Sequence, residues 1–286
     1  MMFMNEPKKP MPPEDRAVTF FNMREDMLVQ YSGKLLEAPY SVPIQLLDTA
    51  KNSMGLSRTI VEASDRKYYS PIMGSLQAET KGAYQEAFSL SRTVVLSDSY
   101  FMEESMLHET HSFLNQGGGK EALVEFYNKG GTVMVWCEEG IYSIGSILSQ
   151  LFGCEWQLGG INNSNETCVP TEQGKALLGP EIAKKVFARG GHMMVVPEGE
   201  GLYQNETLGL EEYLDENYGV SLDDEDDDEE LLDALRAYRR YKKSNAASHL
   251  IAVHHNESGG RLIWLGDRKQ VDSNMRAIVA KLCYGQ

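Results

Sequence analysis

One cysteine lies where nucleophilic chemistry would need it. Cys137 follows the apolar run 132–136 and precedes a segment, from Ile141, with the apolar spacing of a helix. A thiol between a strand and a helix N-terminus can act as a nucleophile, because the positive end of the helix dipole favours the thiolate. The alternative is a buried structural thiol, since free cysteine is among the most buried residue types.

Polar side chains follow the ends of two predicted strands. They are Asp98, Ser99, Glu138, Glu139 and Tyr142. The carboxyl ends of parallel strands meet at one edge of a sheet, where open α/β folds bind ligands, so we predict that these residues form a ligand-binding site. The alternative for the two glutamates is a simpler one, in which they cap the helix and interact with its dipole.

A histidine and a glutamate near the C-terminus form an H-x-E motif. His255 and Glu257 can supply a general base and a carboxylate partner to a thiol, so the predicted catalytic residues are Cys137, His255 and Glu257. The alternative is that both are ordinary polar residues at the end of a hairpin, because H-x-E alone is a nonspecific motif.

The elements that must position these residues alternate between strand and helix. The predicted order is strand 93–97, helix 120–129, strand 132–136, helix 141–152 and strand 154–158. The run 132–136 is apolar without alternation, as in a strand that is buried on both faces of a parallel sheet. This rhythm predicts an α/β fold with a flavodoxin-like, doubly wound parallel sheet, in which strands 93–97 and 132–136 lie near each other.

The flanking segments are less regular. Upstream we expect strands at 17–21 and 59–63 and a helix around 43–53. Downstream, short apolar pieces such as 192–196, within the turn-rich stretch 161–210, predict an antiparallel C-terminal excursion. A helix at about 229–243, a hairpin formed by 249–255 and 261–265, and a closing helix at 273–282 complete the chain.

The domain organisation follows from composition. Residues 1–15 are rich in proline and charge and predict a disordered lead-in, and residues 16–286 predict a single α/β domain. Eight consecutive acidic residues, 223–230, predict an exposed acidic loop over 222–230, because so many adjacent carboxylates repel one another.

Composition also excludes several classes of function. The net charge of −15 disfavours nucleic acid as a partner, and the chain lacks the roughly 20 consecutive apolar residues that a membrane helix needs. Four widely spaced cysteines form neither a disulfide framework nor a zinc pattern. We therefore expect a cytoplasmic protein with no metal and no cofactor, whose partner is a small molecule or a protein.

The chain resembles the class I glutamine amidotransferase-like superfamily. The resemblance rests on the strand–Cys137–helix order, on His255-Asn256-Glu257, and on the stretches Gly130–Val133 and Gly259–Asp267, and it covers roughly residues 90 to 270. The last two stretches are similar to elements of branches that are not amidotransferases, such as trehalose-utilisation-like proteins. The resemblance implies the α/β fold and a nucleophile elbow of the form G-x-C-x-G at Cys137.

The residues around Cys137 differ from that elbow. Val135 and Glu139 stand where the family has small residues, and adjacent carboxylates disfavour a thiolate. We therefore expect an amidotransferase-like domain without an intact glutaminase elbow, which binds a small ligand or a protein. The alternative is a hydrolase that uses Cys137 with His255 and Glu257, or with the carboxylates at the sheet edge.

Overall fold

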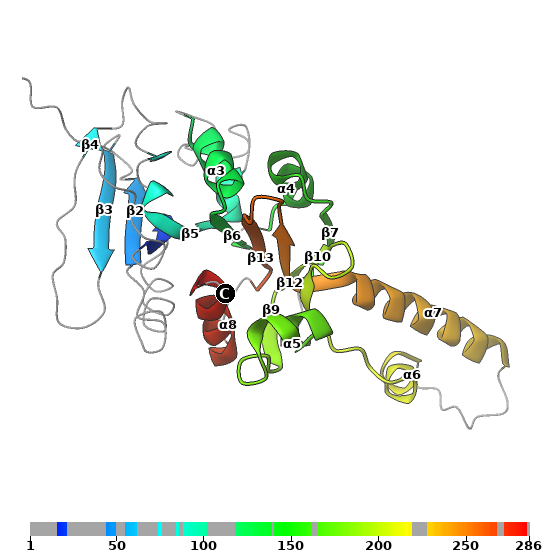
Figure 1. The fold of residues 1–286 in the computed structure, drawn as a ribbon. Coiled ribbons are helices and arrows are strands. Elements are labelled where there is room, and N and C mark those ends of the chain that lie inside the picture. The colour runs from blue at the N-terminus through cyan, green and yellow to red at the C-terminus, as the bar shows by residue number, and fades with distance from the viewer. Residues whose placement is uncertain are drawn as a thin grey trace, which may run out of the picture. The chain divides into compact units, whose positions relative to one another are not determined.

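The structure is a computed structural model of the 286-residue chain. It describes residues 16–21, 44–49, 55–61, 74–75, 84–85, 88–101, 118–138, 140–161, 165–218, 228–267 and 272–284. Figure 1 shows the described elements, which are helices and strands of a mixed α/β protein. The predicted α/β class is therefore confirmed.

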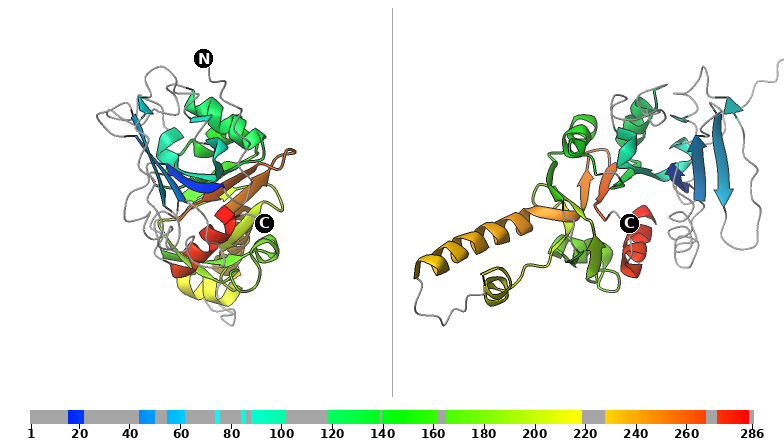
Figure 2. Two further views of the ribbon diagram at one scale, coloured as in Figure 1. Left: turned by 60° about the vertical axis from the view of Figure 1, so that its left-hand side comes forward. Right: turned by 180° about the vertical axis from the view of Figure 1, so that it is seen from behind.

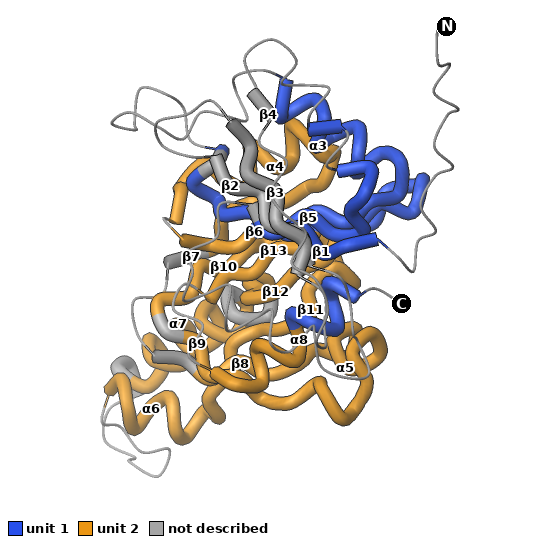
Figure 3. Tube along the Cα trace, turned by 90° about the vertical axis from the view of Figure 1, so that its left-hand side faces the viewer, with its two compact units in different colours: residues 1–135, 255–262, 279–286 blue, residues 136–254, 263–278 orange. Residues whose placement is uncertain are grey.

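The chain divides into two compact units, which Figure 3 distinguishes by colour. Unit 1 contains residues 1–135, 255–262 and 279–286, and unit 2 contains residues 136–254 and 263–278. The chain passes between them within strands and within the last helix, so neither unit is a continuous stretch of sequence.

Unit 1 contains the parallel part of the sheet. Its strands follow the order β4-β3-β2-β1-β5-β6. Strand β1 pairs in parallel with both β2 and β5, whereas β3 pairs antiparallel with β2 and with β4. Their bounds are β1 Ala17–Phe21, β2 Ile44–Thr49, β3 Gly55–Val61, β4 Gly74–Ser75, β5 Ser91–Ser97 and β6 Thr132–Trp136. The predicted proximity of β5 and β6 is confirmed, because they are neighbours in this order.

Two elements of unit 1 differ from expectation. The predicted helix around 43–53 is wrong, because Ile44–Thr49 is strand β2, paired with β1 on one side and with β3 on the other. The strand predicted at 59–63 begins earlier, at Gly55. Pairing with neighbouring strands overrides a weak local helical pattern.

Helix α3, Gly119–Asn128, connects β5 to β6 in sequence and buries its apolar side. Leu123 and Phe126 are buried, as the predicted helix at 120–129 requires. Gly130 ends the helix with φ of 90°, a conformation that side chains disfavour, and its amide donates to the carbonyl of Tyr127 at 3.0 Å. The turn leads directly into β6, whose five residues are all buried.

Unit 2 begins with helix α4, Ile144–Phe152, and strand β7, Gln157–Ile161. Both start three residues later than predicted. Before β7, the Ser149 hydroxyl donates to the Trp156 carbonyl at 3.0 Å and accepts from the Trp156 amide at 3.1 Å. Both backbone groups of Trp156 are thus bonded to a side chain instead of to a neighbouring strand. The expectation that this strand extends the parallel run is also wrong, because β7 pairs antiparallel with β10.

The remaining strands of unit 2 form the predicted antiparallel excursion. They are β8 Asn165–Pro170, β9 Val186–Arg189, β10 His192–Val195, β11 Gly201–Asn205, β12 Ser248–His255 and β13 Arg261–Leu265, and the last two extend into unit 1. The pairs β8–β9, β8–β11, β11–β12 and β10–β12 are antiparallel. The excursion and the β12–β13 hairpin strands are therefore confirmed.

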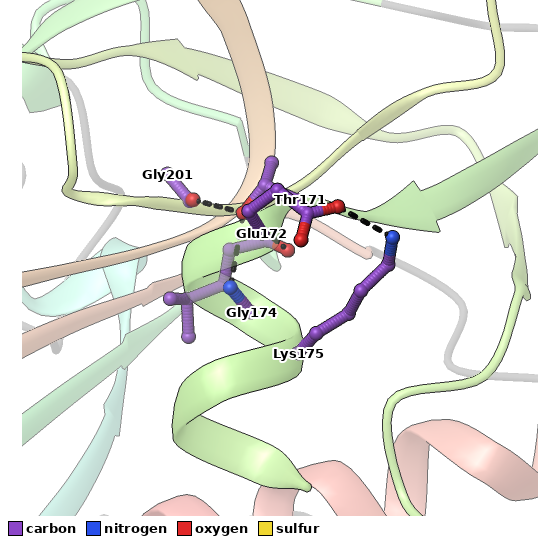
Figure 4. Close-up of polar contacts among 6 residues, drawn as sticks. Thr171, Glu172, Gly174, Lys175 and Gly201 are labelled. Atoms are coloured by element: carbon purple, nitrogen blue, oxygen red, sulfur yellow. Dashed lines mark hydrogen bonds and ion pairs between the residues drawn. The ribbon is translucent and has the colours of Figure 1, made fainter. Parts of the chain in front are cut away.

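Helix α5, Glu172–Leu178, is fixed at its N-terminus by Thr171 (Figure 4). The Thr171 hydroxyl accepts from the amide of Gly174 at 3.0 Å and donates to the carbonyl of Gly201 at 2.7 Å. Lys175 pairs with Glu172 at 2.6 Å on the exposed side. A Cβ on Gly174 would lie 2.2 Å from the carbonyl oxygen of Leu202, so only glycine fits this close approach.

Three helices complete the described chain: α6 Leu210–Tyr218, α7 Asp228–Ala247 and α8 Ser273–Tyr284. The predicted helices at 229–243 and 273–282 are confirmed, with α7 longer at both ends. The predicted acidic loop 222–230 and the lead-in 1–15 lie largely outside the described residues; the last three acidic residues, 228–230, belong to α7. Among the described helices, none is both long and apolar enough to span a bilayer.

Candidate functional site

Cys137 is a fully buried residue at the end of β6. None of its surface is exposed, and its amide donates to the carbonyl of Leu265, the last residue of β13, at 2.9 Å. Cys137 therefore continues the backbone pairing of the strand beyond Trp136. A substrate in solvent has no access to a thiol in this position.

The loop that follows Cys137 packs on a buried histidine. Gly140 has φ of 75°, and a Cβ at this position would lie 2.1 Å from Cε1 of His192. The amide of His192 donates to Gly266 at 2.8 Å, and the Trp264 indole N–H donates to the carbonyl of His192 at 3.0 Å. The imidazole is therefore fixed between this loop and the end of β13.

Asp267, the second residue after β13, is also buried. The backbone hydrogen bonds of Cys137 to Leu265 and of His192 to Gly266 place both residues at the end of β13, next to Asp267 in the chain. We call Cys137, His192 and Asp267 the β13-end cluster, and all three are buried. Sequence reasoning located Cys137 here but missed His192 and Asp267. Asp267 could have been predicted, because it ends the stretch Gly259–Asp267 that carries part of the family resemblance.

The other residues predicted at the sheet edge lie in different surroundings. Asp98 and Ser99 belong to unit 1, where they begin the short 3-10 helix Asp98–Phe101 after β5 and are buried. Ser97 Oγ lies 2.9 Å from Ser99 Oγ and accepts from the Ser99 amide at 3.2 Å. These bonds close a tight turn at the end of the strand.

Glu138 and Tyr142 belong to unit 2, on the loop between Cys137 and α4. Glu138 is half-buried, and the Tyr142 side chain is 79% exposed. Glu139 lies outside the described residues. The ligand-binding role of these residues stays a prediction.

His255 and Glu257 belong to unit 1 and are exposed; His255 ends β12, and Glu257 lies within the turn of the β12–β13 hairpin. Between them, Asn256 orders the turn, since its side-chain oxygen accepts from the amides of Ser258 at 3.0 Å and Gly260 at 2.6 Å. Cys137 belongs to unit 2, so its predicted catalytic contact with His255 joins the two units and stays a prediction.

A different histidine, His254, makes a close contact with a glutamate within unit 2. His254 Nδ1 lies 2.7 Å from Glu200 Oε1, and both side chains are about four-fifths buried. The Trp156 indole N–H donates to the other carboxylate oxygen of Glu200 at 2.5 Å. Glu200 is also fixed through its backbone, because its carbonyl accepts from the Val253 amide at 2.8 Å.

We call this second arrangement the Glu200–His254 pair. The carboxylate orients the imidazole of His254 through Nδ1, and among the described residues no hydrogen-bond partner lies at Nε2. Sequence reasoning missed the pair because Glu200 is 54 residues away from His254 in the chain. The H-x-E motif predicted His255 as the catalytic histidine, whereas the histidine with a close carboxylate contact in unit 2 is the preceding residue, His254.

The remaining cysteines are not suited to nucleophilic chemistry. All four cysteines of the chain are buried and free. Burial raises the pKa of Cys154 to about 11 and that of Cys283 to about 12, so both are thiols at neutral pH. Across the described residues, His, Cys, Asp and Glu side chains form no group of three or more that could hold a metal ion.

Comparisons with known proteins give a structural likeness and no match in sequence. No protein-family model matches the chain, and no curated protein matches it in sequence. A solved structure described as "mmIFT52 N-terminal domain" aligns over 94% of this chain and 98% of its own, with 12% identity and a TM-score of 0.46. At that TM-score the likeness carries no argument about fold or function.

Proposed function

We propose that the chain is a glutamine amidotransferase-like domain without a working glutaminase elbow, whose role is to bind a small ligand or a protein. The observation that carries this proposal is the complete burial of Cys137. A nucleophile must touch its substrate, and the Cys137 backbone pairs with Leu265 as an ordinary strand residue does.

The residues around the thiol support the same conclusion. An active elbow needs small residues next to the cysteine so that a backbone amide can face the substrate oxyanion. Val135 is large and fully buried, and the positive φ of the loop occurs at Gly140, three residues after the thiol. The glycine of this loop is therefore one position later than the second glycine of the G-x-C-x-G elbow, which would be at position 139.

Alkylation and glutaminase assays test this proposal. We expect no ammonia release from glutamine, and we expect iodoacetamide to modify Cys137 about a hundredfold more slowly in the folded protein than in urea, because a buried thiol reacts only after local opening. Peptide mass spectrometry assigns the modified cysteine, and His255→Ala should leave the rate unchanged.

The opposite results would support the alternative, a hydrolase that uses Cys137, His255 and Glu257. Hydrolysis of glutamine would directly refute the proposal that the glutaminase elbow does not work. Rapid alkylation of Cys137 at neutral pH that slows in His255→Ala would do the same, because it requires an exposed thiolate activated by that imidazole.

The proposal includes the finer features expected from the sequence. We infer a flavodoxin-like, doubly wound arrangement, which is supported by the parallel pairs of β1 and by α3 between β5 and β6 in sequence. Free cysteines support a cytoplasmic location, and the net charge of −15 argues against nucleic acid as the ligand.

A second candidate function is favoured by the Glu200–His254 pair. A carboxylate 2.7 Å from Nδ1 fixes the imidazole so that Nε2 can take a proton from water, and it stabilises the imidazolium that forms. The resulting hydroxide would attack the carbonyl of an activated ester, and the tetrahedral intermediate would break its bond to the alcohol oxygen. The alcohol leaves with the proton that His254 took from water, so that the products are the acid and the alcohol and His254 is neutral again. This chemistry needs no thiol, so it is independent of Cys137.

Two adjacent histidines provide a matched comparison for this second function. If the pair is a general base, His254→Gln and Glu200→Gln should each lower the hydrolysis of p-nitrophenyl acetate about a hundredfold. His255→Gln, at the next position, should leave it unchanged. Equal rates in all variants, with folding verified by circular dichroism, would show that the pair has only a structural role.

A further inference from the structure

Helix α7 is held in unit 2 by one of its faces. Figures 1 and 2 show that this helix extends away from the strands of the unit. The Tyr213 ring of α6 packs against Tyr238 and Tyr241, with ring centroids 5.3 and 4.7 Å apart. The Tyr238 hydroxyl donates to the carbonyl of Leu208 at 3.1 Å, and the Tyr241 hydroxyl accepts from the Leu208 amide at 3.3 Å. These contacts fix which face of α7 is turned away from α6.

The opposite face of α7 is exposed and basic. Arg236, Arg239, Arg240 and Lys243 recur at the i, i+3, i+4 and i+7 spacing of a single helix face, and all four are exposed. We call these four residues the α7 basic face. Its ends are seven residues apart, which is about 10 Å along the helix. The nearby acid Asp233 already pairs with Arg236 at 2.9 Å, so it leaves the other three bases without a carboxylate.

The structure of unit 2 gives these bases no stabilising role. Cations favour a helix within its last turn, and the last turn of α7 contains no basic residue. The neighbouring helix α6 carries four exposed acids, Glu211, Glu212, Asp215 and Glu216. Within the part of the chain that the structure describes, none of these acids forms an ion pair with the α7 basic face.

The bases of this face also repel one another. Arg236 and Arg240 are four residues apart, and so are Arg239 and Lys243, a spacing at which like charges destabilise a helix. The α7 basic face therefore lowers the stability of its own helix in the free protein. A negatively charged partner would remove this repulsion, so the face favours binding to such a partner.

From these observations we propose that the α7 basic face binds a short acidic segment of another protein, with about four carboxylates spread over about 10 Å. Arginine suits this role, because its planar guanidinium can bind a carboxylate through two parallel hydrogen bonds. The proposal goes beyond the proposed function, since it involves neither Cys137 nor the Glu200–His254 pair.

A short acidic segment fits this face better than nucleic acid or a membrane does. A polyanion longer than the face would extend its charge past Asp233, in a chain whose net charge is already −15. At physiological salt, charges interact over about 8 Å, so a segment that ends with the face interacts with its bases alone. A helix that binds a membrane inserts an apolar face, and the apolar face of α7 is packed on Tyr213 of α6.

Fluorescence anisotropy with the full chain tests the proposal. The probe is a fluorescein-labelled helical peptide that carries four glutamates at the i, i+3, i+4 and i+7 spacing. We expect a dissociation constant of about 10–100 μM at 0.1 M NaCl, and a value about tenfold higher or more at 0.5 M, because exposed ion pairs are screened.

Two neutralised variants of equal charge separate this face from the rest of the surface. Arg239→Gln together with Arg240→Gln should weaken binding about tenfold or more. It should not lower the thermal midpoint, because it removes repulsion within α7. The matched control, Lys129→Gln together with Lys184→Gln, removes two exposed positive charges elsewhere and should bind the peptide like the unmodified chain.

A charge exchange shows that lost binding is not lost folding. The reversed variant changes all four bases of the face: Arg236→Glu, Arg239→Glu, Arg240→Glu and Lys243→Glu. It should lose the glutamate peptide and bind a peptide that has lysines at the same four positions, whereas the unmodified chain should not bind the lysine peptide. Circular dichroism verifies that each variant keeps its helices.

Several results would overturn the proposal. They are no binding of the glutamate peptide at about 100 μM, equal binding by the Arg239→Gln, Arg240→Gln variant, or failure of the charge exchange. Tighter binding of a single-stranded oligonucleotide with four phosphates, or of phosphatidylserine vesicles, through the same arginines would also overturn it. So would binding that occurs only after the substitutions Asp223→Asn, Asp224→Asn, Glu225→Gln, Asp226→Asn and Asp227→Asn, because the face would then be occupied by the acidic run of the chain itself.

Discussion

At the scale of the residue, His249 links burial to pH. Its side chain is buried in β12, and it packs so closely on Gly201 that a Cβ there would lie 2.0 Å from the imidazole. Burial lowers the pKa of His249, while hydrogen bonds to the backbone of Ala247 and Met194 act weakly in the other direction. The folded state therefore favours the neutral imidazole.

This shift predicts a loss of stability in mild acid. The unfolded chain takes up a proton at His249 below about pH 6.5, whereas the folded protein takes it up only at lower pH. The contribution is thus fully present above pH 6.5 and decreases as the pH falls through the folded pKa. Urea midpoints measured between pH 7.5 and 5 should decrease, and less steeply in His249→Phe.

His255 provides the control for that measurement. It is exposed at the end of the same strand, so His255→Gln should keep the pH dependence of the unmodified chain. If His249→Phe loses stability in acid as steeply as the unmodified chain does, His249 is not the titrating group.

The chemistry-bearing residues could be predicted only in part. The position of Cys137 at the end of β6 followed from a local pattern, an apolar run before a helix. The partners of buried side chains could not be found in this way. Glu200 contacts His254, and His192 packs on Gly140, although the residues of each pair are about 50 positions apart in the chain. Such contacts leave no local trace in the sequence.

At the scale of the element, the strongest local patterns gave the best predictions. Strand β6 was predicted at its observed bounds, because an uninterrupted apolar run has few alternatives to burial. The end of α4 was also predicted, since Gly153 adopts φ of 74° there. An uninterrupted apolar run or a helix-ending glycine therefore allows the bounds of an element to be predicted from the sequence.

Strands β7 and β2, whose bounds depend on pairing with neighbouring strands, were predicted incorrectly. The strand predicted at 154–158 stops before Gly159 and Gly160, yet both glycines lie within β7. A Cβ on Gly159 would lie 2.7 Å from Ser248 Oγ and 2.8 Å from a methyl carbon of Val195, so glycine is used here for close packing between strands. Strand β2 is a similar case, because its pairing with β1 and β3 decides its conformation.

At the scale of the whole molecule, the C-terminal residues complete unit 1. Residues 279–284 belong to it, and Val279, Leu282 and Cys283 are buried. The Thr93 hydroxyl donates to the carbonyl of Cys283 at 2.7 Å, and Arg261 donates to that of Leu282 at 3.2 Å. The first of these contacts joins residues 190 positions apart, which is why the sequence alone gave no sign of it.

This arrangement predicts that unit 1 cannot form without the end of the chain. Burying each large apolar side chain contributes about 1.5–3 kcal/mol, and whole domains are stable by only about 5–15 kcal/mol. Deletion of residues 279–286 removes several such side chains and leaves the Thr93 hydroxyl and the Arg261 guanidinium without these acceptors. We therefore expect the shortened chain to lose its cooperative thermal transition and most of its near-ultraviolet circular dichroism. Deletion of residues 285–286 alone is the control and should shift the midpoint little; a midpoint within about 2 °C of the full chain after the longer deletion would contradict the assignment of these residues to the core of unit 1.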